Sequence, residues 1–134
     1  MRTLTIVEAL KEAIREELDR DERVFCIGED IGTPGGWGGA FTVTQGLSDI
    51  YGLDRILDTP IAEIGLAGVA IGAAIGGMRP IADVQYGDFL FCMMDQLANQ
   101  AAKLRYVRRQ AHGSDGYACP RRSYYQRRTA CAKS

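Results

Sequence analysis

Residues 54–89 read DRILDTPIAEIGLAGVAIGAAIGGMRPIADVQYGDF, and this stretch decides the fold. A short strand is predicted at 55–58 and ends at a Thr-Pro break, because proline cannot continue the hydrogen-bond ladder of a strand. Residues 62–78 have the length of a helix, and their many glycines and alanines predict very close packing against a neighbour. An Arg-Pro pair is expected to end this helix, and another strand is predicted at 81–85. The order strand, helix, strand indicates two parallel strands.

The sequence on either side continues the same alternation. Thr5 and Glu8 have the spacing of a capping box, which predicts a helix that begins there and ends near Arg20. Residues 24–27 form a fully apolar run, which is typical of a strand buried on both faces. Two further segments have the apolar spacing of helices: 43–51 and 89–106. In the second of these, the side chains expected to point inward are Phe91, Met94, Leu97, Ala98, Ala101 and Leu104. We therefore expect an α/β fold with a largely parallel sheet flanked by helices.

Charge divides the chain into two parts. The 134 residues carry a net charge of −1, which gives no reason to expect nucleic acid or a membrane surface as a partner. Residues 1–107 hold 9 Lys and Arg against 16 Asp and Glu, whereas 108–134 hold 7 against 1. The second part also lacks Val, Ile, Leu, Met and Phe, so it cannot bury enough apolar surface to fold. We expect residues 1–107 to form the domain and residues 108–134 to be an aberrant, disordered basic tail.

Targeting and metal-binding signals are not apparent. Charges interrupt the amino-terminal helix too early for a signal peptide, and the apolar stretch 64–78 contains five glycines and is too short to span a bilayer. We expect a cytoplasmic chain. The four cysteines show no CxxC pair and no metal-ligand spacing, so free thiols and no metal site are predicted.

Acidic residues follow two of the predicted strands, and they are the candidate site. Glu63 comes after a strand and its Thr-Pro break, at the first turn of the Gly-Ala helix. The helix dipole favours a carboxylate there, and open α/β sheets bind ligands at the carboxyl ends of their strands. Many helices begin with an acid that serves only the backbone amides, which is the structural alternative for Glu63. Glu29 directly follows the buried strand, and its alternative is a solvated turn.

Two other features lie near these strand ends. The glycine-rich loop 32–39 lacks the Lys-Ser/Thr of a phosphate-binding loop and is predicted to be a mobile loop. Tyr86 and Phe89 flank a turn after the last predicted strand. Aromatic side chains in such a place stack on a flat heterocycle or, more often, complete the edge of the core.

The run ILDTPIAEIGLAGVAIGAAIGGMRPIADVQYGDFLF, followed by DQLANQAAKLRY, strongly resembles the pyrimidine-binding domain of the E1 β subunits of pyruvate and branched-chain 2-oxoacid dehydrogenases. The run VFCIGEDIG resembles their first strand and acidic turn. The resemblance extends from about residue 4 to 107, and the D-T-P-I-x-E-x-G run at 58–65 is specific for this group. It implies a thiamine-diphosphate-binding fold, of which this chain would hold a truncated pyrimidine-binding domain.

The resemblance implies roles for four residues. In the family, the glutamate of the D-T-P-I-x-E-x-G run hydrogen-bonds N1′ of the thiamine aminopyrimidine, and Glu63 matches it. Gln85 and Phe89 match positions that contact or stack on that ring, and Glu29 matches an acidic residue behind the cofactor. The implied cofactor is thiamine diphosphate, and the implied reaction is oxidative decarboxylation of a 2-oxoacid with acyl transfer to a lipoyl domain. The substrate stays open among pyruvate, branched-chain 2-oxoacids and acetoin.

The resemblance also implies partners. The E1 α subunit supplies most of the Mg²⁺ and diphosphate site, and two α and two β chains form a heterotetramer that serves the lipoyl domains of an E2 core. Family β chains are more than twice as long as this one, so we expect a fragment that is inactive alone. The alternative is a non-catalytic interaction module whose basic tail binds an acidic partner.

The tail departs from the family at Arg108. Permitted codons for residues 108–120, read one base later, allow the string GGKLTVPMVMRAP, which is close to the family's continuation. A frameshift is therefore our hypothesis for the tail, and a divergent but genuine segment is the alternative.

Overall fold

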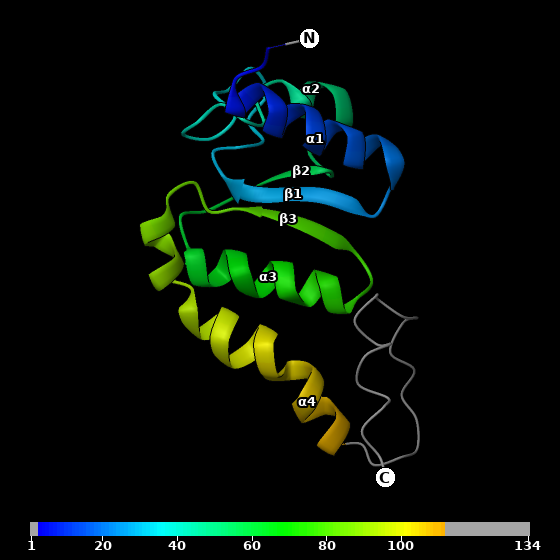
Figure 1. The fold of residues 1–134 in the computed structure, drawn as a ribbon, viewed down its shortest axis with the longest axis vertical. Coiled ribbons are helices and arrows are strands. Elements are labelled where there is room, and N and C mark those ends of the chain that lie inside the picture. Colours follow the sequence, from blue (N-terminus) through cyan, green and yellow to red (C-terminus); the bar gives the residue numbers. More distant parts are fainter. Residues whose placement is uncertain (1–2, 112–134) are drawn as a thin grey trace.

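The computed structural model describes residues 3–111 (Figure 1). Most of the predicted basic tail, residues 112–134, lies outside the described residues. The elements in chain order are α1 (Ile6–Arg20), β1 (Val24–Glu29), α2 (Leu47–Tyr51), β2 (Ile56–Thr59), α3 (Glu63–Ile75), β3 (Arg79–Asp83), the 3₁₀ helix η1 (Gly87–Phe91), the π-helix η2 (Asp95–Ala101) and α4 (Ala102–Ala111). None of the helices between residues 3 and 111 is both long and apolar enough to cross a membrane.

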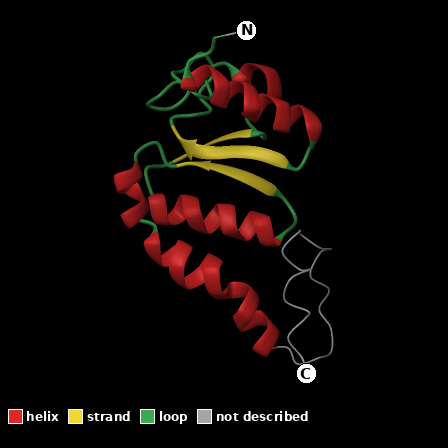
Figure 2. Ribbon diagram, in the orientation of Figure 1, coloured by secondary structure: helices red, strands yellow, loops and turns green. Residues whose placement is uncertain are grey.

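Three parallel strands form the sheet in the order β2-β1-β3. The central strand β1 places Cys26 opposite Ile56 of β2 and Ile81 of β3. Helices α1 and α2 cover one face of the sheet and α3 covers the other, with α4 outside α3 (Figure 2). This arrangement confirms the predicted α/β fold with a parallel sheet flanked by helices.

Helix α1 begins with the predicted capping box. The Glu8 backbone N–H donates to Thr5 Oγ1 at 3.2 Å, and the Thr5 backbone N–H donates to Glu8 Oε2 at 2.8 Å. These reciprocal bonds satisfy two amides at the helix start, which otherwise have no partner within the helix. The helix ends at Arg20, as predicted.

Alternate residues of β1 enter two separate cores, one on each face of the sheet. The core under α1 and α2 consists of Leu18, Val24, Cys26, Ile31, Leu47 and Ile56. The core under α3 consists of Phe25, Ile27, Leu66, Ala67, Ala70 and Met93. The fully apolar run of β1 is therefore buried on both faces, as the sequence predicted.

Two boundary predictions were wrong. Helix α3 already ends at Ile75, where Gly76 and Gly77 form the turn, and Gly77 has a φ of +97° that favours glycine. Arg79 and Pro80 therefore begin β3 instead of ending the helix. The proline is tolerated because β3 lies at an edge of the described sheet.

The long helix predicted over 89–106 is three differently wound segments. Phe91 and Met94, expected to point inward, are 78% and 42% exposed, whereas Met93 is 2% exposed and joins the core. The 3₁₀ and π turns advance the chain by different angles from an α-helix. A period of 3.6 residues therefore assigns the wrong face to this segment.

Candidate functional site at the carboxyl edge of the sheet

The candidate residues meet at one edge of the sheet. Because the three strands are parallel, their carboxyl ends lie together, with Glu29 opposite Thr59 and Gly28 opposite Asp83. The chain leaves β2 for the start of α3, which carries Glu63, and leaves β3 for Gln85. This is the edge at which open α/β sheets bind ligands.

Glu29 supports the start of α3. Its Oε1 accepts a hydrogen bond from the backbone N–H of Ala62 at 3.0 Å, and Ala62 is the residue before the first turn of the helix. A helix start offers amides that have no partner within the helix, so this bond satisfies one of them. Glu29 is half-buried, and its carboxylate is bonded to the residue that precedes α3.

Glu63 is the first residue of α3. Its side chain is half-buried, and among residues 3–111 no group forms a hydrogen bond or ion pair with its carboxylate. The acceptor that serves a backbone amide at this helix start is Glu29, so Glu63 does not fill the structural role that was its alternative. The positive end of the helix dipole lies next to the negative charge of Glu63, an arrangement that is favourable for a carboxylate.

Gln85 connects three segments at this edge. Its Nε2 donates to the backbone carbonyl of Glu29, and its Oε1 accepts from the backbone N–H of Ala40 at 3.3 Å. Its own backbone N–H donates to Asp83 Oδ1 at 2.9 Å. The carboxamide of Gln85 therefore lies between the end of β1 and the end of the glycine-rich loop.

Asp58, which sequence reasoning did not select, holds the other end of the glycine-rich loop. Its Oδ1 accepts from the backbone N–H groups of Ile31 at 2.7 Å and Gly32 at 3.0 Å. Its Oδ2 accepts from Thr33 Oγ1 at 2.9 Å. The loop passes so close to β2 that a Cβ on Gly32 would lie 2.5 Å from the carbonyl oxygen of Ile56. The sequence signal that was available is an acidic residue at a strand end, the same signal that selected Glu29.

Three aromatic rings, those of Phe41, Tyr86 and Phe89, pack together beyond the carboxyl end of β3. The ring centroids of Phe41 and Tyr86 are 5.2 Å apart, and those of Tyr86 and Phe89 are 5.5 Å apart. Phe41 and Tyr86 are 49% and 47% exposed, so these rings do more than complete the core. Phe41 was not predicted, because it lies far along the chain from the other two rings and no periodicity connects them.

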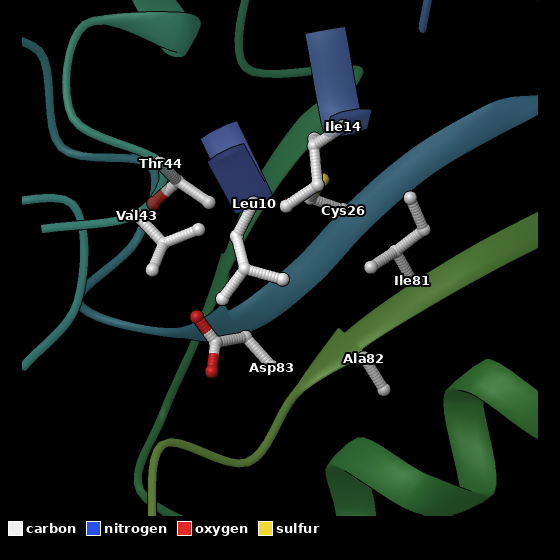
Figure 3. Close-up of a pocket in the computed structure, with 8 residues that line it drawn as sticks. All are labelled: Leu10, Ile14, Cys26, Val43, Thr44, Ile81, Ala82 and Asp83. Atoms are coloured by element: carbon white, nitrogen blue, oxygen red, sulfur yellow. The ribbon is translucent and has the colours of Figure 1, made fainter. Parts of the chain in front are cut away.

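A separate hollow lies on the face of the sheet that α1 covers (Figure 3). Its volume is about 190 Å³, and it is lined by Leu10, Ile14, Cys26, Val43, Thr44, Ile81, Ala82 and Asp83. Burial, together with the negative charge of Asp83, raises the pKa of the Cys26 thiol to about 11. A thiol with that pKa stays protonated near neutrality, so Cys26 is a core residue and no nucleophile.

The part of the chain between residues 3 and 111 contains no group of three or more His, Cys, Asp or Glu side chains arranged to hold a metal ion.

The comparisons with known proteins agree with this geometry. The model of a family described as "Transketolase, pyrimidine binding domain" matches residues 2–117. The chain is 42% identical over 120 residues to the 2-oxoisovalerate dehydrogenase subunit beta of Bacillus subtilis (strain 168), a match that covers 90% of this chain and 34% of that protein. It is 44% identical over 104 residues to the pyruvate dehydrogenase E1 component subunit beta of Rickettsia bellii (strain RML369-C), covering 78% and 31%. The chain thus spans about a third of the length of these curated relatives.

The family match includes the sheet, the Gly-Ala helix and the edge that carries Glu29, Glu63 and Gln85. It confirms the resemblance to dehydrogenase E1 β subunits, while the domain boundary at Val107 stays a prediction. With its parallel sheet, its Gly-Ala helix and this matched range, the chain belongs to the family of the transketolase pyrimidine-binding domain, and its relatives are named as β subunits of dehydrogenases.

Proposed function

We propose that this chain supplies the aminopyrimidine-binding half of a thiamine diphosphate site in the E1 component of a 2-oxoacid dehydrogenase. The observation that carries the proposal is Glu63, a half-buried carboxylate at the carboxyl edge of the sheet without a hydrogen-bond partner among the described residues. The residues fit a flat, nitrogen-containing ring. A free carboxylate accepts a hydrogen bond from a ring nitrogen, and the exposed rings of Phe41 and Tyr86 offer stacking surface next to Phe89.

Each residue then has a specific task. Glu63 holds a proton at N1′ of the aminopyrimidine, and its place at the first turn of α3 is favourable for a carboxylate. Glu29 keeps the start of α3 in place through Ala62, and Phe89 stacks on the ring together with Tyr86. When bound, thiamine diphosphate supplies the chemistry that decarboxylation of a 2-oxoacid requires, and the protein supplies orientation and electrostatics.

The partners follow from the relatives. Both relatives are named as beta subunits, and one of them as part of an E1 component, so we infer an α partner for this chain as well. In this proposal the α subunit holds Mg²⁺ and the diphosphate, an α₂β₂ heterotetramer forms, and the acyl group passes to a lipoyl domain of the E2 core. The chain alone should then show no turnover. The alternative of a non-catalytic interaction module draws no support from the comparisons.

The proposal is tested with the half of the cofactor that this chain should recognise by itself. The isotope-labelled chain is titrated with 4-amino-2-methylpyrimidine at millimolar concentration while amide resonances are recorded by NMR. We expect shifts at the start of α3 and around Tyr86 and Phe89, and their loss in Glu63→Gln. Glu16→Gln is the matched control, because Glu16 is exposed on α1 at the far side of the sheet. No shifts in the wild-type chain would refute the aminopyrimidine site.

A further inference from the structure

Backbone strain is concentrated at the carboxyl edge. The described non-glycine residues with positive φ are Asp30 at 57°, Thr42 at 59° and Gln85 at 64°. Asp30 follows β1, Thr42 follows the glycine-rich loop, and Gln85 follows β3. Residues other than glycine rarely adopt a positive φ, and they keep it only where the surrounding structure holds the backbone in place. Such strained residues occur repeatedly at functional sites.

The hydrogen bonds of Gln85 explain how its backbone is kept at a positive φ. Asp83 Oδ1 accepts from the Gln85 backbone N–H, which fixes the turn directly after β3. With the backbone fixed in this way, the carboxamide extends between two other segments and bonds one backbone group of each. The donor end contacts Glu29, and the acceptor end contacts Ala40. Near neutral pH, only an amide offers a donor and an acceptor at the end of one side chain of this length, because a carboxylate has no donor.

The two carboxamide bonds connect Gln85 with both parts of the proposed site, the carboxylate of Glu63 and the aromatic rings. On the donor side, Gln85 bonds the backbone carbonyl of Glu29. The carboxylate of Glu29 in turn accepts from the backbone N–H of Ala62, the residue immediately before Glu63. On the acceptor side, Ala40 precedes Phe41, whose ring packs against Tyr86. One carboxamide therefore connects the carboxylate and the aromatic rings.

We infer that Gln85 is a positioning residue, whose carboxamide sets the location of Glu63 through Glu29 and of Phe41 through Ala40. This differs from the ring contact that the family resemblance implies for Gln85. The inference rests on the proposed function, since the groups that Gln85 positions are those that would receive the aminopyrimidine. The experiments below use the ligand-free chain, so their outcome for Gln85 does not depend on whether the aminopyrimidine binds.

The first test measures amide hydrogen exchange in the whole, ligand-free chain. Gln85→Met keeps the side-chain length and removes both bonds, so the Ala40 amide should exchange roughly fivefold faster, which is the effect of one ordinary hydrogen bond. The Ala62 amide should also exchange faster, because Glu29 loses its support. Gln100→Met is the matched control on an exposed residue of η2. Unchanged exchange at Ala40 and Ala62 in a folded variant would overturn the inference.

The second test uses Trp37, the single tryptophan of the sequence. Its side chain is 78% exposed. Trp37 lies in the loop whose first end is held by Asp58, through Ile31 and Gly32, and whose second end is held by Gln85, through Ala40. In Gln85→Glu at pH 7 the introduced carboxylate cannot donate to the Glu29 carbonyl, so the fluorescence anisotropy of Trp37 should fall. Protonation near pH 4.3, about the usual glutamate value, restores a donor, and the anisotropy should return toward that of the wild type.

A residue with a merely structural role would not show this recovery in acid. Two acidic residues contact Gln85: the backbone carbonyl of Glu29 accepts from its carboxamide, and Asp83 Oδ1 accepts from its backbone N–H. The wild-type chain and Gln85→Met are therefore taken through the same pH series to separate the effects of these carboxylates. Anisotropy in Gln85→Glu that stays low in acid, relative to these two chains, would overturn the inference. If Gln85→Met does not fold, Gln85→Asn replaces it, because asparagine tolerates positive φ but is one methylene too short to connect both segments.

Discussion

The two ends of β1 are held in different ways. At its amino end four charged residues, Asp21, Arg23, Arg55 and Arg79, are paired with one another or with backbone carbonyls. Arg23 and Arg79 both contact Asp21 Oδ2, at 2.7 and 3.1 Å, and Arg55 donates to the carbonyls of Val24, Leu18 and Asp21. At its carboxyl end the carboxylates of Glu29 and Asp58 accept from neutral backbone amides, and Glu63 has no partner in the described chain.

Under the proposed function, the amino end of β1 serves the stability of the domain and its carboxyl end serves recognition of the ligand. At the amino end the carboxylate of Asp21 and the guanidinium groups of Arg23, Arg55 and Arg79 all have partners within the chain. At the carboxyl end the carboxylates of Glu29, Asp58 and Asp83 fix backbone amides, whereas Glu63 at a helix start has no partner among the described residues. A group without an internal partner contributes little to folding, and under the proposed function Glu63 is the group that receives the ligand. The following predictions test this comparison.

Arg55→Met should have the largest effect on stability. Its Nε donates to the Val24 carbonyl at 2.6 Å, and Nη2 donates to those of Leu18 and Asp21 at 2.9 and 3.1 Å. Loss of these charged donors should lower the free energy of unfolding by about 3 kcal/mol, as measured by urea denaturation. Arg105→Met, on the exposed side of α4, is the control and should change it by less than about 0.5 kcal/mol. Equal effects of the two variants would contradict the special role of Arg55.

Asp58→Ala should have a smaller effect, of about 2 kcal/mol, because it removes three bonds to the glycine-rich loop from a residue near the surface. The loss should appear both in urea denaturation and in faster exchange of the Ile31 and Gly32 amides. Asp54→Ala, in the exposed turn before β2, provides the comparison. Slow exchange of both amides in Asp58→Ala would show that the loop is held by other means.

Acid should weaken the amino end of β1. The side chain and backbone N–H of Arg23 bond to Asp21, and together with Arg79 they hold the pKa of that carboxyl well below its usual range. A carboxyl whose folded pKa is lowered contributes stability above its unfolded pKa, and that stability is lost as the pH falls through the folded value. Between pH 5 and pH 2 the urea midpoint should therefore fall less steeply in Asp21→Asn than in the wild type. Asp49→Asn, exposed in the first turn of α2, should retain the wild-type slope.

Glu63→Gln should have the smallest effect on stability. Because no described residue bonds its carboxylate, the free energy of unfolding should change by less than about 0.5 kcal/mol. The same substitution should abolish the response to 4-amino-2-methylpyrimidine. A loss of more than about 2 kcal/mol would mean that Glu63 serves the fold, and the contrast between the two ends of β1 would fail.

Local patterns in the sequence predicted most of the fold. The capping box at Thr5, the apolar run of β1 and the Thr-Pro break after β2 each reflect a rule that acts within a few residues, and each was confirmed. The failures have a physical cause as well. The glycine pair at Gly76 ended α3 before the Arg-Pro pair did, and the 3₁₀ and π turns after Gly87 have no sequence signature of their own.

The candidate site was predictable only in part for the same reason. Glu29 and Glu63 are visible because each lies directly after a recognisable break in the chain. The contacts of Gln85 with Glu29 and Ala40, and of Phe41 with Tyr86, join residues that are 56, 45 and 45 positions apart. Such pairs follow from the way in which parallel strands bring their ends together, and no local pattern encodes them.

The central position of β1 has a consequence for how the molecule opens. In the described sheet β1 alone has a strand on each side, and both cores rest on it, whereas β2 and β3 have one neighbour each. The outer strands can fray while the rest stays closed, but the backbone of β1 becomes accessible only when both cores separate. The amides of β1 therefore report the global opening of the domain, and those of β2 and β3 report local opening events of lower free energy.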